Sequence, residues 1–123
     1  MIPIIETQTT AEITALQNQL LQKQIAYLME KSPFYQQKFK EENIKLGTIQ
    51  TINDLKKVSV TTKNDLKLYN DDFFCVPKQD ILDYATTSGT LGDPVTFGLT
   101  DNDLERLAYN EMLSFQCAGV PPS

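Results

Sequence analysis

The sequence contains no histidine and no tryptophan, and only two of its 123 residues are cysteines. Without histidine, the chain alone cannot house a Ser–His or Cys–His catalytic pair, or a metal centre ligated by imidazole. Cys75 and Cys117 lie far apart, with no second cysteine beside either of them. The sequence therefore predicts neither a metal site nor a disulfide framework, and we expect both cysteines to be small buried apolar side chains.

Basic residues are also scarce. The 11 lysine and arginine residues are outnumbered by 16 acidic residues, which gives a net charge of −5. Nucleic acids are held by clustered Lys and Arg, so this balance argues against a nucleic-acid partner. No apolar run is long enough to span a bilayer, and the first residues lack the basic segment and apolar core of a signal peptide. We therefore expect no membrane partner and a location in the cytoplasm.

The first 70 residues predict a helical subdomain. Apolar residues recur at steps of three and four over residues 10–31, the pattern of an amphipathic helix. A Ser-Pro pair at residues 32–33 is typical of the start of a second helix, which should end near Asn43. Capping boxes at residues 51–54 and 62–65 predict two further short helices.

The composition changes near residue 71. Two runs favour strands, Ile81–Thr87 and Val95–Leu99, and the apolar run Phe73–Val76 before Pro77 is a third candidate, so two or three strands are expected. A capping box at residues 100–103 then predicts a helix that ends before Gly119. Residues 71–123 are thus expected to begin an α/β region, which within this chain is an α+β arrangement of a small β-ribbon and a covering helix. Because a two-stranded ribbon is marginal by itself, we expect an incomplete part of a larger domain.

Hydroxyl groups and glycines are concentrated between the last two β-favouring runs. Such a loop suits an oxyanion, because hydroxyls and backbone N–H groups converge on it and glycine lets the backbone approach closely. The candidate phosphate contacts are Ser88, Gly89, Thr90 and Gly92. The alternative is a plain hairpin connection, since turns favour the same residues. A Walker A loop is excluded, because no Gly-Lys-Ser/Thr follows and the segment leads into a strand.

The segment Thr87–Pro94, Thr-Ser-Gly-Thr-Leu-Gly-Asp-Pro, resembles the phosphate-binding loop of adenylate-forming enzymes (the acyl-CoA synthetase and luciferase superfamily). The usual form of that loop is Ser/Thr-Ser-Gly-Thr-Thr-Gly-Lys-Pro. Other segments resemble the phenylacetate-CoA ligase branch in order and spacing, and they are Ser32–Tyr35, Thr61–Leu66, Phe97–Thr100 and Ala118–Val120. By this resemblance the chain is identified as an N-terminal fragment of such a ligase.

The resemblance implies an ATP-dependent acid–CoA ligase that requires Mg²⁺. In this family, ATP and an aryl or acyl carboxylic acid form an acyl-adenylate and pyrophosphate, and coenzyme A then displaces AMP. Ser88, Gly89, Thr90 and Gly92 are the implied contacts of the β- and γ-phosphates, with Thr87 as an auxiliary contact. The family's AMP-binding and catalytic residues lie beyond Ser123, so the resemblance implies that the 123-residue chain has no catalytic residue and no turnover alone.

Two positions depart from the family pattern. Leu91 stands where a second threonine is usual, and Asp93 stands where lysine is usual. An anion beside a polyphosphate weakens binding, unless a magnesium ion lies between them. These departures favour an alternative function, a non-catalytic interaction or dimerisation module. A third interpretation is adenylation of another carboxylate.

Four aromatic residues in the helical subdomain have two interpretations. At helical spacing, aromatic side chains usually belong to a core. The alternative is that they line a pocket for an aromatic acid or a homodimer interface. The ligase resemblance also implies a homodimer through this subdomain. The residues are Tyr27, Phe34, Tyr35 and Phe39.

Overall fold

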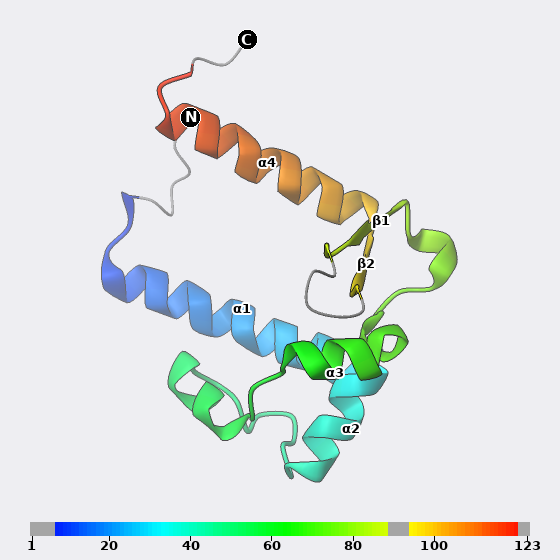
Figure 1. Ribbon diagram of the computed structural model, residues 1–123. Coiled ribbons are helices and arrows are strands. Elements are labelled where there is room, and N and C mark those ends of the chain that lie inside the picture. Colours follow the sequence, from blue (N-terminus) through cyan, green and yellow to red (C-terminus); the bar gives the residue numbers. More distant parts are fainter. Residues whose placement is uncertain (1–6, 89–93, 121–123) are drawn as a thin grey trace. The chain divides into compact units, whose positions relative to one another are not determined.

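The computed structural model describes residues 7–88 and 94–120, and Figure 1 shows the order of the elements along the chain. The chain divides into two compact units, Pro3–Cys75 and Val76–Ser123. We call them the helical unit and the ribbon unit and describe each separately. Among the described residues, no helix combines the length and apolar character that crossing a membrane requires.

The helical unit begins with two helices that meet at a buried serine. Ser32 ends α1 and caps α2, and it is fully buried. Its hydroxyl accepts a hydrogen bond from the Tyr35 N–H (3.3 Å) and donates one to the carbonyl oxygen of Asp72 (3.4 Å). The Ser32 side chain therefore lies where α1 meets α2 and links this point to Asp72, 40 residues later. The elements of this unit are α1 (Thr10–Lys31), α2 (Pro33–Glu41), η2 (Ile52–Lys57), α3 (Lys63–Leu68) and η3 (Asn70–Phe73).

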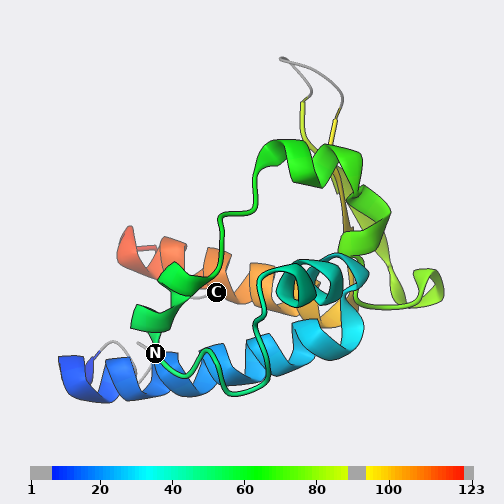
Figure 2. The same cartoon turned by 90° about the horizontal axis from the view of Figure 1, so that it is seen from below.

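The core of the helical unit consists of four buried apolar residues, Ile25, Phe39, Ile44 and Ile49. The chain turns at the end of α2, where Asn43 takes a positive φ of 55°, and again at Gly47, whose positive φ of 87° suits glycine. Figure 2 shows η2 beside α1. Two hydrogen bonds join these segments, from the Gln22 amide to the Gln50 carbonyl (2.8 Å) and from the Ile52 N–H to the Asn18 side chain (2.9 Å).

The apolar run Phe73–Val76 does not form a strand. Residues Asn70–Phe73 form the 3₁₀ helix η3, and the described residues contain two strands, both in the ribbon unit. The Phe73 ring stacks on Phe34 with a centroid distance of 4.0 Å and meets Tyr35 edge-on at 5.9 Å. These long-range contacts override the local β preference, so the third candidate strand does not form, and of the two or three strands expected the described residues contain two.

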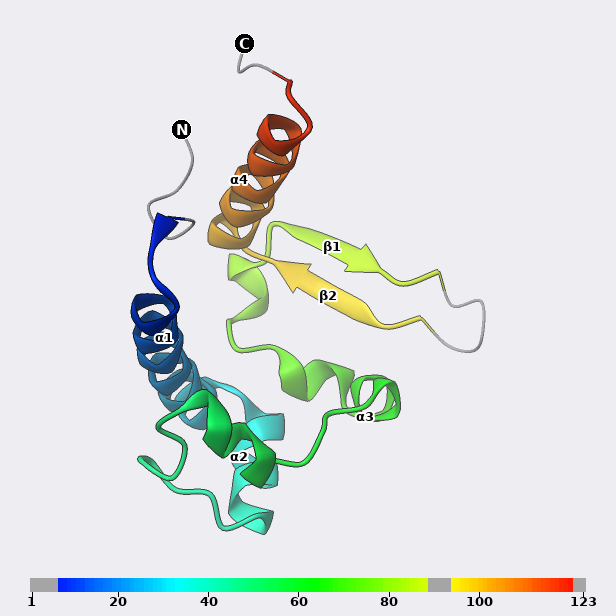
Figure 3. The same cartoon turned by 90° about the vertical axis from the view of Figure 1, so that its left-hand side faces the viewer.

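The ribbon unit contains η4 (Lys78–Asp80), strands β1 (Asp83–Thr86) and β2 (Thr96–Leu99), and helix α4 (Asp101–Cys117). The strands pair antiparallel, with Asp83 opposite Leu99 and Thr86 opposite Thr96. Figure 3 shows them side by side and running in opposite directions, with α4 following β2. The predicted fold, a mostly helical chain with a small ribbon and a following helix, is confirmed.

Capping boxes begin four of the helices. The three predicted boxes are all present, at Thr51–Asp54, Thr62–Asp65 and Thr100–Asp103. Thr9 and Glu12 form a fourth, which the sequence analysis missed. In each box the threonine N–H and hydroxyl bond to the carboxylate three residues later, and these bonds lower the pKa of the carboxyl group. At Asp54 the hydrogen bond from Lys57 lowers the pKa most.

The two cysteines are not the buried side chains that the sequence predicted. Cys75 is half-buried, and burial raises the pKa of its thiol. Cys117 is exposed on α4, a helix that contains no buried residue. Both thiols are free, and their local sequence carries no signal of how far a neighbouring element covers them.

The capping boxes predict a loss of stability in acid. Because the folded-state pKa of each box carboxyl lies below its unfolded value of about 4, the stabilisation is present above that pH and is lost as pH falls. We expect the unfolding free energy, measured by urea denaturation from about pH 6 to about pH 3, to decrease. Asp65→Asn, which retains an acceptor oxygen for Thr62, should fold normally and show a shallower decrease. An unchanged pH slope in this variant would contradict the argument.

Candidate functional site

Two hydrogen bonds join Thr87 and Val95, the residues from which the glycine-rich loop leaves the ribbon. This pair of residues is called the neck of the loop. The Thr87 N–H donates to the Val95 carbonyl at 3.0 Å, extending the β1–β2 ladder by one step. In the opposite direction, the Val95 N–H donates to the Thr87 hydroxyl, also at 3.0 Å. Val95 is 1% exposed, so its N–H depends on this side chain in place of water. The loop thus leaves the ribbon from a defined pair of residues.

The structure describes two of the five predicted site residues. Thr87 is half-buried at the neck, and Ser88 is exposed one residue further on. A hydroxyl has one donor and two acceptor positions, so the Thr87 oxygen that accepts from Val95 keeps its proton for a second partner. Gly89, Thr90 and Gly92 lie outside the described residues, as do the departures Leu91 and Asp93.

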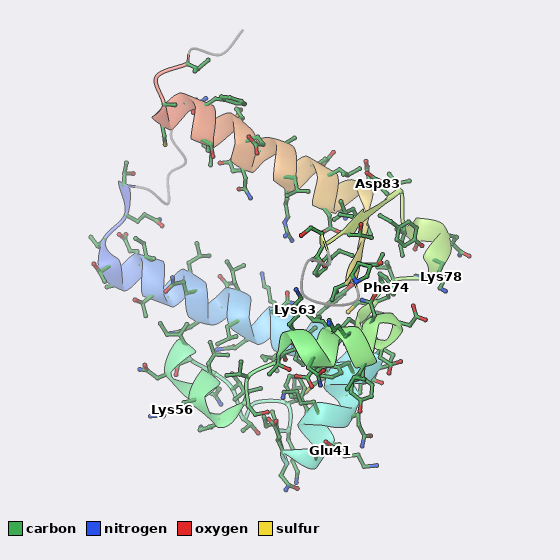
Figure 4. All side chains as sticks on the ribbon, viewed as in Figure 1. Glu41, Lys56, Lys63, Phe74, Lys78 and Asp83 are labelled. Carbon is green, nitrogen blue, oxygen red and sulfur yellow. The ribbon has the colours of Figure 1, made fainter. Side chains whose placement is uncertain are left out.

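The ribbon unit is strongly acidic. Residues 76–123 contain seven acidic residues but only two basic ones, Lys78 and Arg106. Lys78 lies in η4 and Asp83 begins β1, as Figure 4 shows. Asp83 pairs with Leu99 at the opposite end of the ribbon from Thr87 and Val95. A polyphosphate at the loop would therefore receive little compensating charge from the side chains of this unit.

A pocket of about 350 Å³ lies on the helical unit, between α2 and the segments that follow it. This pocket was not predicted from the sequence, because the residues that line it are spread over 40 positions, from residue 33 to residue 72. Its wall combines aromatic and charged side chains, among them Phe34, Lys38, Glu42, Ser59, Tyr69 and Asp72. Glu41 also lines it, and Figure 4 shows this residue at the end of α2.

The charged groups of this pocket bond to one another. Lys38 Nζ lies 3.2 Å from the Glu42 carboxylate and also donates to the Ser59 hydroxyl, which in turn donates to Glu42. Burial raises the pKa of Glu42, but these hydrogen bonds together lower it by more, so the group stays ionised at neutral pH. A lysine that donates and a carboxylate that accepts within one closed network provide neither a general base nor a nucleophile. The network of hydrogen bonds therefore joins α2 to the loop that contains Ser59.

The predicted aromatic cluster lies partly in the core. Phe39 is buried, Phe34 and Tyr35 are half-buried, and Tyr27 is exposed. The Tyr35 hydroxyl is 3.1 Å from the Thr61 hydroxyl, so its polar end is satisfied within the unit. Among the described residues, no group of His, Cys, Asp or Glu side chains is arranged to hold a metal ion.

The chain is similar in sequence to several phenylacetate-coenzyme A ligases. It is 34% identical over 119 residues to that of Escherichia coli (strain K12), covering 96% of this chain and 27% of the ligase. It is 32% identical over 121 residues to that of Thermus thermophilus, again covering 27% of the ligase. The chain therefore spans about a quarter of the length of these relatives. No protein-family model matches it.

A solved enzyme structure has a similar fold. A 2-hydroxyisobutyryl-CoA ligase, in complex with 2-HIB-AMP and CoA, matches with a TM-score of 0.77 at 30% sequence identity. The match covers 85% of this chain and 23% of that ligase. An open conformation of the same ligase with the same ligands gives a TM-score of 0.77 at 28% identity. The sequence and structural matches thus agree that this chain corresponds to about a quarter of a ligase.

Two substitutions of Thr87 are expected to differ in their effect on the hydrogen bond to the Val95 N–H. Thr87→Val keeps the shape of the side chain but leaves the buried Val95 N–H without an acceptor, which costs about 1–3 kcal/mol. We expect amide exchange at Val95, measured by NMR, to become roughly 5- to 150-fold faster. Thr87→Ser keeps the hydroxyl and is the matched control, with slow exchange retained. Equal exchange rates in the two variants would show that the hydroxyl does not hold the neck.

Proposed function

Because the chain is homologous to part of the phenylacetate-CoA ligases, we propose that it forms part of an ATP-dependent acid–CoA ligase. The observation that carries this proposal is 34% identity over 96% of the chain. In the proposed reaction, a carboxylate oxygen of an aryl or acyl acid attacks the α-phosphorus of ATP, and pyrophosphate leaves. The thiol of coenzyme A then attacks the carbonyl carbon of the acyl-adenylate, and AMP leaves. The match to a ligase in complex with 2-HIB-AMP and CoA supports this order of events.

Within that reaction, residues 87–94 are proposed to hold the β- and γ-phosphates of ATP. Thr87 and Ser88 would donate from their hydroxyls, and Gly89, Thr90 and Gly92 from the backbone or side chain. The defined neck supports this role, since donors that are held in place before ATP arrives lose less conformational entropy on binding. We further propose that residues 71–123 begin the nucleotide-binding region.

Mg²⁺ is the proposed source of positive charge at this loop. The acidic balance of residues 76–123 and the aspartate at position 93 support its participation. Mg²⁺ prefers carboxylate and phosphate oxygens and commonly binds through one or two carboxylates together with substrate phosphates. With the ion between them, Asp93 would attract the polyphosphate instead of repelling it. In this proposal the metal replaces the lysine that is usual in the family.

The remaining proposals concern location and association. ATP and coenzyme A are cytoplasmic substrates, so we propose the cytoplasm as the site of action. A homodimer through the helical unit is proposed because Leu46 and Val60 are 73% and 82% exposed. A non-catalytic interaction module is the second candidate function, favoured by Leu91, which removes a hydroxyl donor from the loop, and by Asp93, which repels a phosphate when no magnesium ion lies between them.

ATP–pyrophosphate exchange tests the ligase proposal. The complete gene product that carries this chain, assayed with a panel of aryl and acyl acids, should incorporate labelled pyrophosphate into ATP with at least one acid. The 123-residue chain alone should show no exchange, since it spans only about a quarter of a ligase. If the complete product is folded by circular dichroism yet gives no exchange with any acid, the interaction module becomes the better account.

The charge at position 93 predicts a change in ATP affinity. Asp93→Lys changes the local charge by two units, and at about 4 Å in water each unit is worth about 1 kcal/mol before screening. At limiting Mg²⁺ we expect the KM for ATP in the exchange assay to fall by roughly 3- to 30-fold, and this difference should shrink at saturating Mg²⁺, where the ion already links Asp93 to the phosphates in the wild type.

The control for this variant is Asp80→Lys. It makes the same charge change in η4, before β1 and thus at the far end of the ribbon from the loop. Its KM for ATP should change less than about twofold, because salt screens charges over about 8 Å. Equal effects of the two substitutions would mean that overall charge, and not the loop, sets the affinity.

A further inference from the structure

The pocket on the helical unit carries an excess of negative charge. All of its lining residues lie between residue 33 and residue 72, so its shape is set within that unit. They include four carboxylates but one ammonium group, that of Lys38, which gives a net charge of −3 when all are ionised. Lys38 is already paired with Glu42 at 3.2 Å. The charge that remains belongs to Glu41, Asp65 and Asp72.

These three carboxylates keep acceptor oxygens for a ligand. In Asp65, Oδ2 accepts from the Thr62 N–H and hydroxyl, which leaves Oδ1. In Glu41, Oε1 accepts from the Gln37 amide, which leaves Oε2. In the part of the chain that the structure describes, the Asp72 carboxylate has no hydrogen-bond or ion-pair partner. A ligand with N–H donors can therefore bond to all three groups without breaking a bond inside the protein.

Aromatic rings form another part of the pocket wall. Phe34 and Tyr69 both line it, with their ring centroids 5.8 Å apart. Phe34 is held in place by stacking on Phe73 at 4.0 Å, whereas Tyr69 is 49% exposed. The faces of such rings attract cations, and this attraction adds to that of nearby carboxylates. The pocket therefore favours a cation that also has apolar surface.

The carboxylates do not converge on one point. Among residues 7–88 and 94–120, no group of three or more His, Cys, Asp or Glu side chains is placed to hold a metal ion. A ligand that meets all three free carboxylates must therefore carry its charge at several positions along its length. The pocket volume of about 350 Å³ lies at the lower end of the range for small-molecule sites, roughly 300–1,000 Å³.

We propose that this pocket binds an aliphatic polyamine. The ammonium groups of a polyamine are spaced along a chain, so they can donate to separate carboxylates. Its methylene groups pack against Phe34 and Tyr69, as the stems of lysine side chains do on apolar surfaces. A single metal ion matches neither feature, and the net charge disfavours an anion. The proposal does not rest on the proposed ligase function.

Calorimetric titration of the complete gene product with spermidine, at low salt and without ATP, tests the proposal. A single saturable site is expected. Asp72→Asn removes a charge from the wall and should weaken binding roughly 3- to 10-fold, the effect of one charge at about 4 Å in water. Asp71→Asn is the matched control, because it makes the same change at the neighbouring exposed position of η3 without lining the pocket. It should change the affinity less than about twofold.

A second pair of variants tests the aromatic wall. Tyr69→Leu keeps an apolar side chain but removes the ring, so spermidine should bind roughly 2- to 5-fold more weakly. Tyr27→Leu is its control, since Tyr27 is 40% exposed on α1 and lies outside the pocket, and it should leave the affinity unchanged. Circular dichroism establishes that each variant is folded before it is titrated. Because Asp72 is exposed, the Asp72→Asn comparison stays decisive if Tyr69→Leu does not fold.

Four results would overturn the proposal. Absence of saturable spermidine binding would mean that the pocket is not a polyamine site. Equal weakening by Asp72→Asn and Asp71→Asn would mean that the acidic surface as a whole attracts spermidine. Equal affinities in Tyr69→Leu and Tyr27→Leu would mean that the rings do not contact the ligand. A trilysine peptide that binds more tightly than spermidine, with the same dependence on Asp72, would make a lysine-bearing polypeptide the occupant.

The outcome is independent of the ligase proposal. None of these titrations uses ATP or measures turnover. A failed exchange assay would therefore leave this inference standing, and a failed titration would leave the ligase proposal standing.

Discussion

The hydrogen bond from the Val95 N–H to the Thr87 hydroxyl is the constraint on which the candidate site depends. The side-chain bond replaces a backbone ladder bond at the last step of the ribbon, where β1 and β2 separate around the loop. Val95 is buried, so breaking this bond leaves a polar group without water. Thr87 thus has a structural role that is compatible with phosphate binding, because its hydroxyl proton stays available.

Charge gives this site its particular character. The helical region is close to neutral, and the excess of acidic residues lies in residues 76–123. In the proposed reaction, such an acidic unit would rely on Mg²⁺ for positive charge beside the polyphosphate. The composition of residues 76–123 therefore bears directly on the proposed metal dependence.

Local signals predicted most of the fold. Capping boxes mark helix starts through hydrogen bonds between residues three apart. The helix starts at Thr51, Thr62 and Thr100 could therefore be predicted from the sequence. The ribbon was predicted because β-branched and aromatic runs flank the glycines. The sequence left open whether residues 73–76 form a third strand; they do not, because Phe73 stacks on Phe34, a contact between residues 39 positions apart. The Thr87–Val95 bond and the pocket around Lys38 and Glu42 also depend on such distant contacts, which spacing along one sequence does not encode.

The central claim is that residues 87–94 hold the terminal phosphates of ATP in a CoA ligase. Direct binding of ATP and of AMP to the complete gene product tests it, with Ser88→Ala compared against wild type by calorimetry. Because AMP lacks the β- and γ-phosphates, the account predicts that the variant binds ATP about tenfold more weakly and AMP equally well. An equal loss for both nucleotides, or no loss for ATP, would contradict the assignment of this loop.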